Sequence, residues 1–186
     1  MITSFLKNYL KWSLILVVGI YSQCTMDAQN KPNAAKATEN TTTATTEPVY
    51  TSSNPGWHVR LDDAFAESQK TGKPIMANFT GSDWCGWCKR LTASVFGKPE
   101  FKTWADKNVV LLELDFPRRT SIPEDIKQQN YQLQNSFQVT GYPTVWVFNL
   151  SKDSKTNQFS IEALGKTGYS PSLEEFTQGV EKMIKK

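Results

Sequence analysis

The stretch Thr80–Leu91 reads TGSDWCGWCKRL and decides the fold of this 186-residue chain. It follows residues 74–79, an apolar run that is typical of a buried strand, and it leads into a helical pattern over residues 91–96. Cys85 is therefore expected at the N-terminus of a helix, with Cys88 one turn inside the same helix. This spacing brings the two sulfur atoms within reach of each other.

The pair Cys85 and Cys88 is suited to thiol–disulfide exchange. The unpaired amides and the positive end of the helix dipole should lower the pKa of the Cys85 thiol. Such a thiolate attacks a disulfide, and the second sulfur then releases the mixed disulfide. The alternatives are a fixed disulfide, which would constrain little chain across one turn, or half of a zinc site. Cys85, Cys88 and His58 supply only three of the four ligands that a closed zinc site takes, so no metal is expected.

Two motifs resemble those of the thioredoxin-like family. The first is WCGWCK at residues 84–89, after a buried strand, and the second is TGYPT at residues 140–144, which resembles the cis-proline loop of that family. The motifs are independent and stand in the family's order, which makes the match more specific than a lone Cys-x-x-Cys. The resemblance covers residues 57–186 and implies a thioredoxin-like fold, with Cys85 as nucleophile and Cys88 as resolving thiol.

The residues beside the two sulfurs are candidates for substrate contact. Trp84 and Trp87 could be packing residues, but two indoles next to a thiol favour an apolar platform for a partner peptide. Gly86 and Trp87 separate the cysteines, and because neither is cationic they favour a reductant or isomerase over a strong oxidant. By resemblance, Tyr142 and Pro143 also contact the substrate, and the proline is expected to be cis.

Asn78 departs from the family pattern. Many members place a buried aspartate near this position on the central strand, where it moves protons for the resolving thiol, and an amide cannot do that. Glu113 and Asp115 on the neighbouring strand and Asp83 are the alternative candidates for this role. Charged residues at strand ends are, however, usually just solvated.

The N-terminus has the pattern of an export signal over residues 1–28. Lys7 and Lys11 form a positive region, and Trp12–Tyr21 is an apolar run that is too short for a membrane span of about 20 residues. Cleavage is expected near residues 27–29. Lipid attachment at Cys24, which would tether the protein to a membrane, is the alternative.

Residues 29–56 are rich in Thr, Ala and Asn and poor in apolar residues, which predicts a disordered linker before a folded domain over residues 57–186. Helices alternate with strands in that domain and a hairpin and a closing helix follow, as in an α/β fold with a central mixed sheet flanked by helices on both faces. Helical patterns cover residues 61–70, 99–107, 124–137 and 172–185, and strand patterns cover residues 75–79, 109–115, 144–149 and 158–164.

The composition narrows the function further. The formal net charge of +3 comes from interspersed acidic and basic residues, which gives no support for nucleic-acid binding. We therefore expect a periplasmic or otherwise exported thiol:disulfide oxidoreductase that needs no cofactor. Its expected partners are cysteine-containing envelope proteins and an unidentified electron donor or acceptor. A non-catalytic peptide-binding or chaperone module with the same fold is the alternative.

Overall fold

The computed structural model describes residues 50–185. The predicted export signal, the lipid attachment at Cys24 and the linker as far as residue 49 lie outside the described residues. Among the helices within residues 50–185, none is long and apolar enough to cross a membrane.

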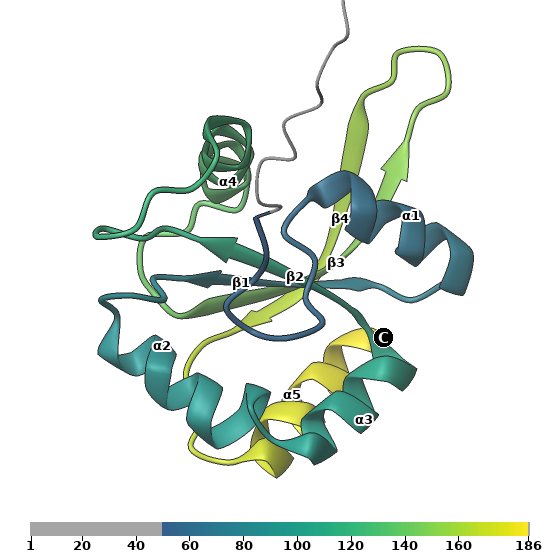
Figure 1. Cartoon of the computed structure of the whole chain (residues 1–186). Helices are drawn as coiled ribbons and strands as arrows, with labels where there is room; N and C mark the ends of the chain where they lie inside the picture. Colours follow the sequence, from purple (N-terminus) through teal and green to yellow (C-terminus); the bar gives the residue numbers. More distant parts are fainter. Residues whose placement is uncertain (1–49, 186) are drawn as a thin grey trace, which may run out of the picture. The chain divides into compact units, whose positions relative to one another are not determined.

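The described chain forms a four-stranded mixed sheet with helices on both faces, which confirms the predicted fold class (Figure 1). The strand order is β2-β1-β3-β4, with β1 and β2 parallel and the other neighbours antiparallel. The strands are β1 (Ile75–Thr80), β2 (Val110–Asp115), β3 (Thr144–Lys152) and β4 (Phe159–Thr167). The helices are α1 (Leu61–Thr71), α2 (Gly86–Leu91), η1 (Thr92–Phe96), α3 (Pro99–Asn108), α4 (Glu124–Ser136) and α5 (Leu173–Ile184).

Each face of the sheet carries its own apolar core, because successive side chains of a strand point to opposite faces. Ile75, Ala77 and Phe79 of β1 pack on the side of α1 and α4. Met76 of the same strand packs on the side of α2, α3 and α5, with Phe176. In Figure 1 the first pair of helices lies above the sheet and the other three lie below it.

The pattern over residues 91–96 predicted a helix, and the chain is helical there. This helix is, however, not an α-helix throughout. After Leu91 it widens into the π-helical turn η1, in which the amide of Gly97 donates to the carbonyl of Thr92 at 2.7 Å. Val95 and Phe96, which lie in this turn, are both buried.

The folded part begins before Trp57, because residues 50–58 lie along β2. We call these residues the N-terminal strap. His58 forms a parallel bridge with Leu112, and Ser53 and Asn54 hydrogen-bond the carboxylate of Glu113. Composition predicted a linker up to residue 56, but the last residues of that segment supply donors to a buried acid.

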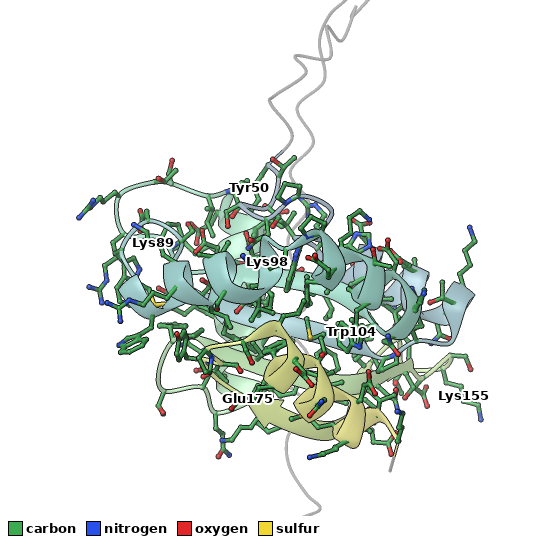
Figure 2. All side chains as sticks on the ribbon, turned by 90° about the horizontal axis from the view of Figure 1, so that it is seen from below. Tyr50, Lys89, Lys98, Trp104, Lys155 and Glu175 are labelled. Carbon is green, nitrogen blue, oxygen red and sulfur yellow. A yellow bond between two sulfur atoms is a disulfide. The ribbon has the colours of Figure 1, made fainter. Side chains whose placement is uncertain are left out.

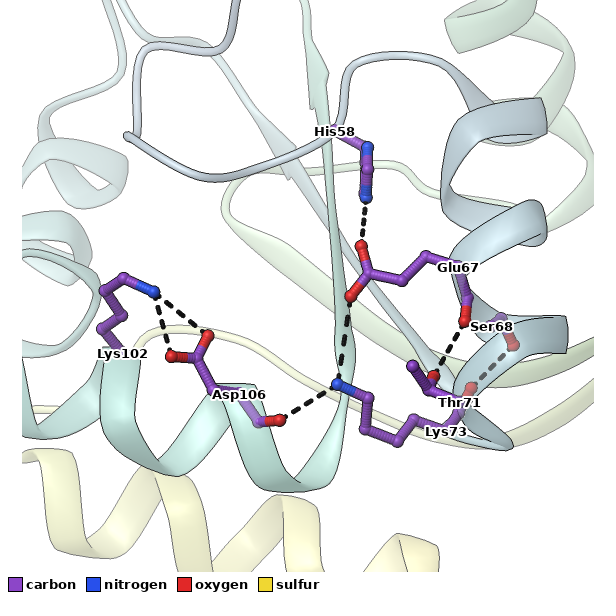
Figure 3. Close-up of polar contacts among 7 residues, drawn as sticks. All are labelled: His58, Glu67, Ser68, Thr71, Lys73, Lys102 and Asp106. Carbon is purple, nitrogen blue, oxygen red and sulfur yellow. Dashed lines mark hydrogen bonds and ion pairs between the residues drawn. The ribbon is translucent and has the colours of Figure 1, made fainter.

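A polar network joins the strap to two helices (Figure 3). Nε2 of His58 lies 2.6 Å from Oε2 of Glu67 in α1, and Nζ of Lys73 lies 3.9 Å from the other oxygen of that carboxylate. Lys73 also donates to the carbonyl of Asp106 in α3, at 3.0 Å. The groups are partly exposed, so the network positions the strap more than it stabilises the fold.

Candidate active site

A tight turn delivers the first cysteine from the end of β1 to the start of α2. The amides of Trp84 and Cys85 donate to the carbonyl of Gly81 at 3.2 and 2.8 Å. A Cβ atom at Gly81 would lie 2.5 Å from the Trp84 indole. Any larger residue at position 81 would have to displace this indole, which folds back over the turn.

Cys85 is the N-cap residue of α2 and forms a disulfide with Cys88. Its Sγ accepts a hydrogen bond from the amide of Cys88 at 3.2 Å, and the two Cα atoms are 5.3 Å apart. In this oxidised form the side chains are only 5% and 3% exposed. Both sulfurs thus lie at the first turn of the helix, where unpaired amides favour negative charge.

The Trp84 side chain is held on three sides. Its Nε1 donates to the carbonyl of Phe116 at 2.8 Å, and the guanidinium of Arg118 lies 3.6 Å from the ring centroid. The ring of Tyr142 meets it edge-on, with centroids 5.8 Å apart. Trp84 therefore connects the turn before Cys85 to the 116–123 loop and to the residue before Pro143.

Trp87, by contrast, is turned outward and is 53% exposed. It meets Tyr169 edge-on at 4.9 Å, and Arg90 lies 4.6 Å from its ring centroid. Gly86 beside it is exposed. Figure 2 shows the neighbouring Lys89 at the end of the molecule that carries the disulfide, far from Lys155 of the β3–β4 hairpin.

The Tyr142–Pro143 peptide bond is cis, and both residues are half-buried. The hydroxyl of Tyr142 accepts a hydrogen bond from Gln134 at 2.6 Å. Burial raises the pKa of the Tyr142 hydroxyl above its ordinary value, and the charge of Tyr131 adds to the effect. Tyr142 therefore stays neutral, with its hydroxyl bound to Gln134.

Asp83 organises the loop that supports Trp84. Its carboxylate accepts hydrogen bonds from the backbone amides of Arg118, Arg119 and Thr120 at 3.1, 2.6 and 3.1 Å. Although desolvation opposes the effect, these hydrogen bonds hold the pKa of Asp83 below its ordinary value. Asp83 is thus committed to the loop, which argues against the predicted role in moving protons.

A buried polar layer lies on the α2 side of the sheet. It comprises two pairs of neighbours on β1 and β2, which are Asn78 with Glu113 and Thr80 with Asp115. All four are at most 5% exposed, so the expectation that such strand-end charges are solvated is wrong here. Asp115 accepts from the amide and hydroxyl of Ser82 at 2.9 and 2.5 Å and so fixes the turn before Cys85.

A cavity of about 200 Å³ opens beside Cys88 and reaches the Thr80 end of this layer. The strap, the end of β1 and the first helix of the site line it, through residues Ser53, Asn54, Thr80, Ser82, Cys88, Lys89 and Thr92. Nowhere in residues 50–185 are three His, Cys, Asp or Glu side chains grouped as metal ligands would be. Cys88 thus borders a cavity whose other lining residues are polar.

Several of these contacts were not predicted from the sequence. Arg118 and Tyr169 lie in connecting segments without a pattern that links them to the cysteines. Ser53 and Asn54 belong to a polar stretch that composition assigned to the linker. The one available signal was the run of strand residues containing Glu113, whose apolar neighbours indicated burial on both faces.

Comparisons with known proteins agree with this geometry. A family model described as thioredoxin-like matches residues 56–149. The chain is 34% identical over 107 residues to the disulfide bond reductase DsbH of Chlamydia pneumoniae, which covers 58% of this chain and 64% of that protein. It is 30% identical over 87 residues to the thioredoxin-related protein DsbJ of the same organism, which covers 47% of this chain and 25% of that protein.

The chain thus spans less than two thirds of the length of either curated relative. A solved structure of DsbH oxidoreductase matches with a TM-score of 0.57 and 26% identity, and the match covers 75% of this chain and 93% of that one.

Proposed function

Because this chain belongs to the thioredoxin-like family, we propose that it is a thiol:disulfide oxidoreductase that reduces or isomerises disulfides of exported envelope proteins. The observation that carries the proposal is the Cys85–Cys88 bridge at the first turn of α2, with an amide donating to Cys85 Sγ. The same amide would stabilise a Cys85 thiolate in the reduced protein. We assign Cys85 as nucleophile and Cys88 as resolving thiol.

The exchange proceeds in two displacements. The Cys85 thiolate attacks a substrate disulfide, so that a mixed disulfide forms and one substrate sulfur leaves as a thiolate. The Cys88 thiol then loses its proton and attacks Cys85 Sγ, which closes the bridge and releases the second substrate sulfur. Two electrons pass from the protein dithiol to the substrate, and a dithiol donor must return them before the next cycle.

The direction of reduction has two supports. The relative DsbH is named a disulfide bond reductase. Gly86 and Trp87, the residues between the sulfurs, carry no positive charge that would stabilise the thiolate further and make the bridge a strong oxidant. A reductant or isomerase therefore fits better than an oxidase.

An aromatic surface around the sulfurs would receive the substrate chain. Trp87 and Tyr169 are the large exposed aromatic side chains beside the disulfide, at 53% and 40% exposure. A second pair of aromatic rings, Trp84 and Tyr142, extends this surface, and Tyr142 precedes the cis proline Pro143. Apolar residues that flank a substrate cysteine would pack on these rings.

The proposed location is the cell envelope. It rests on the export signal predicted over residues 1–28, with lipid attachment at Cys24 as a second way of holding the protein there. Mass spectrometry of the protein from its own envelope distinguishes a cleaved N-terminus from a lipid-modified Cys24.

Insulin reduction by the purified protein, with a small dithiol as electron donor, tests the activity. We expect turnover in the wild type and none in Cys85→Ser. Turnover that survives both Cys85→Ser and Cys88→Ser, or an inactive wild type, would reject the oxidoreductase.

Trapping tests the order of the two displacements. Cys88→Ser, expressed in its own envelope, should accumulate mixed disulfides through Cys85 because the resolving thiol is missing. The matched variant Cys85→Ser should accumulate few. More adducts in Cys85→Ser than in Cys88→Ser would reverse the assignment of nucleophile and resolving thiol, and equal adducts would reject a fixed order.

The exposure of Trp87 and Tyr169 also favours a second function, a non-catalytic peptide-binding or chaperone module. In that case Trp87→Ala would reduce peptide binding, while a protein lacking both cysteines would bind as well as the wild type. The insulin assay separates the two functions because a binding module does not turn over.

A further inference from the structure

Glu113 is a buried acid that the exchange as described does not use. Its side chain is 1% exposed and lies on β2, inside the sheet. The backbone amide of Ser53 donates to one carboxylate oxygen at 2.7 Å, the Ser53 hydroxyl lies 3.0 Å from each oxygen, and Asn54 donates to the second oxygen at 2.5 Å. A buried carboxylate is tolerated only with such partners, so the strap keeps this acid inside the protein.

The carboxylate lies on the side of the sheet that faces α2. On β2, Leu112 and Leu114 pack in the core beneath α1 and α4, so the residue between them points to the opposite face. Its register partner on β1 is Asn78, whose Oδ1 is buried and without a hydrogen-bond partner. The central strand thus carries an amide and the neighbouring strand carries the acid.

Ser53 contacts this acid and also borders the cavity that Cys88 lines. Its hydroxyl contacts both carboxylate oxygens of Glu113, and Ser53 lines the same cavity of about 200 Å³ as Cys88. Serine, threonine, asparagine and lysine residues line the cavity beside Cys88, and its volume exceeds by several-fold the volume of about 30 Å³ that one water molecule takes in the liquid. Water in this cavity can join the Cys88 sulfur to the Ser53 hydroxyl.

The other ionisable groups around Glu113 are already committed or remain neutral. Asp115 is bound to Ser82. Burial, together with the charges of Asp115 and Glu113, raises the pKa of Tyr50 far above its ordinary value, so Tyr50 stays protonated. Lys89 lines the outer part of the cavity and donates to the carbonyl of Asp83 at 3.2 Å.

We propose that Glu113 accepts the proton of the Cys88 thiol in the resolving step, through the cavity water and the Ser53 hydroxyl. The inference rests on the proposed function and names a positioning residue for it. As the Cys88 S–H bond breaks, the proton reaches the Glu113 carboxylate. The Cys88–Cys85 bond forms, the bond from Cys85 to the substrate breaks, and its electron pair leaves on the substrate sulfur. Glu113 then returns the proton to solvent through the cavity.

The sign of the effect distinguishes this role from electrostatics alone. A negative charge near a thiol raises the thiol's pKa, so Glu113→Gln would by that effect make Cys88 a better nucleophile and speed the resolving step. Loss of a proton acceptor slows the same step instead. A purely structural role would disturb the step equally at every pH.

The test follows the reduced full chain as it reacts with dithiobis(nitrobenzoate), an aromatic disulfide that releases a coloured thiolate. All variants carry Cys24→Ser, so that only Cys85 and Cys88 react. The first phase is the attack of Cys85 and depends on the reagent concentration. The second phase is the attack of Cys88 on the mixed disulfide and does not. Failure of the proposed function removes the first phase, whereas failure of this inference concerns only the second.

For Glu113→Gln we expect an unchanged first phase and a second phase slowed at least about tenfold near pH 7. The second-phase rates of Glu113→Gln and wild type should become equal above about pH 9, where a thiol with a pKa of about 8.5 ionises without a proton acceptor. Asn78→Asp in the Glu113→Gln protein returns an acid to the adjacent strand and should restore the second phase. The matched control Glu162→Gln, at an exposed carboxylate on β4, should leave both phases and their pH dependence unchanged.

Ser53→Ala gives a milder test that does not depend on whether Glu113→Gln folds. Ser53 is exposed, and the hydrogen bond from its backbone amide to the Glu113 carboxylate remains in this variant. It should slow the second phase about threefold or more at neutral pH. A second phase in Glu113→Gln that is unchanged, faster, or slowed equally at all pH values would overturn the proposal. If Glu113→Gln does not fold, a second phase in Ser53→Ala that is as fast as in the wild type would also overturn the proposal.

Discussion

Adding a methyl group at Gly81 should displace the Trp84 side chain and destabilise the protein. A Cβ atom there would lie 2.5 Å from two indole atoms and 2.8 Å from a third. Ordinary contacts begin near 3.4 Å, so the ring has to retreat by roughly 0.9 Å in a close-packed site. The backbone of Gly81 itself does not have a positive φ, so the effect comes from the side chain alone.

The retreat breaks the three contacts that hold the indole. The hydrogen bond to the Phe116 carbonyl contributes about 1 kcal/mol. The Arg118 guanidinium over the ring contributes about 0.5–1 kcal/mol, and the edge contact with Tyr142 a similar amount. We therefore expect Gly81→Ala to lower the free energy of unfolding by about 2–3 kcal/mol, measured by urea denaturation of the oxidised protein.

A double-mutant cycle isolates the cause. In a Trp84→Ala protein there is no indole to displace, so adding Gly81→Ala should cost less than about 0.5 kcal/mol. The matched control is Gly86→Ala, where nothing lies within 4 Å of the added Cβ, and it should leave stability unchanged or raise it slightly. If Gly81→Ala were equally destabilising with and without the indole, the steric reasoning would be refuted.

Three further changes test the fold around the site. Phe101→Ala should lower the free energy of unfolding by about 3–5 kcal/mol, because the ring is 1% exposed and packs against Phe96 and Phe176; a loss below about 1 kcal/mol in urea would contradict the packing. Ser172→Ala should cost about 1 kcal/mol, since its hydroxyl accepts the Glu175 amide at the start of α5, whereas Ser172→Asp should retain the cap. Asp83→Asn should destabilise at pH 7, because backbone hydrogen bonds, against the opposing effect of desolvation, hold the pKa of that carboxyl below its ordinary 3.8. The carboxylate stabilises the fold at pH values above its ordinary pKa, and this stabilisation is lost as the pH falls through the lowered pKa of the folded protein. The free energies of unfolding of wild type and variant should therefore converge at low pH. A difference between them that stays constant with pH would contradict this prediction.

The strands and most helices follow from local patterns. The run at residues 74–79 is apolar and bounded by Pro74 and the active-site turn, and it forms β1 with almost the predicted bounds. The periodic positions of residues 61–70 predicted α1, and its end is fixed by Gly72, which has a φ of 69°. These features depend on residues close together in sequence, so the sequence alone carries them.

The supporting contacts depend on residues far apart. Glu113 meets partners about sixty positions earlier in the chain, in a segment whose composition predicts no structure. Arg118 reaches Trp84 only because Asp83 gathers three amides of the 116–123 loop. Neither contact is marked in the sequence by a regular spacing of residues or by a periodic pattern. The π-helical turn after Leu91 was not predicted either, because the pattern over residues 91–96 indicates a helix but does not distinguish an α-helix from a π-helix.

The position of the strap also has a mechanical consequence. A force that pulls on the chain at Tyr50 is transmitted first to the bonds that Ser53 and Asn54 make with Glu113, before any helix or strand of the domain bears tension. Stretching this entry point would therefore expose the acid to solvent while the rest of the fold remained intact.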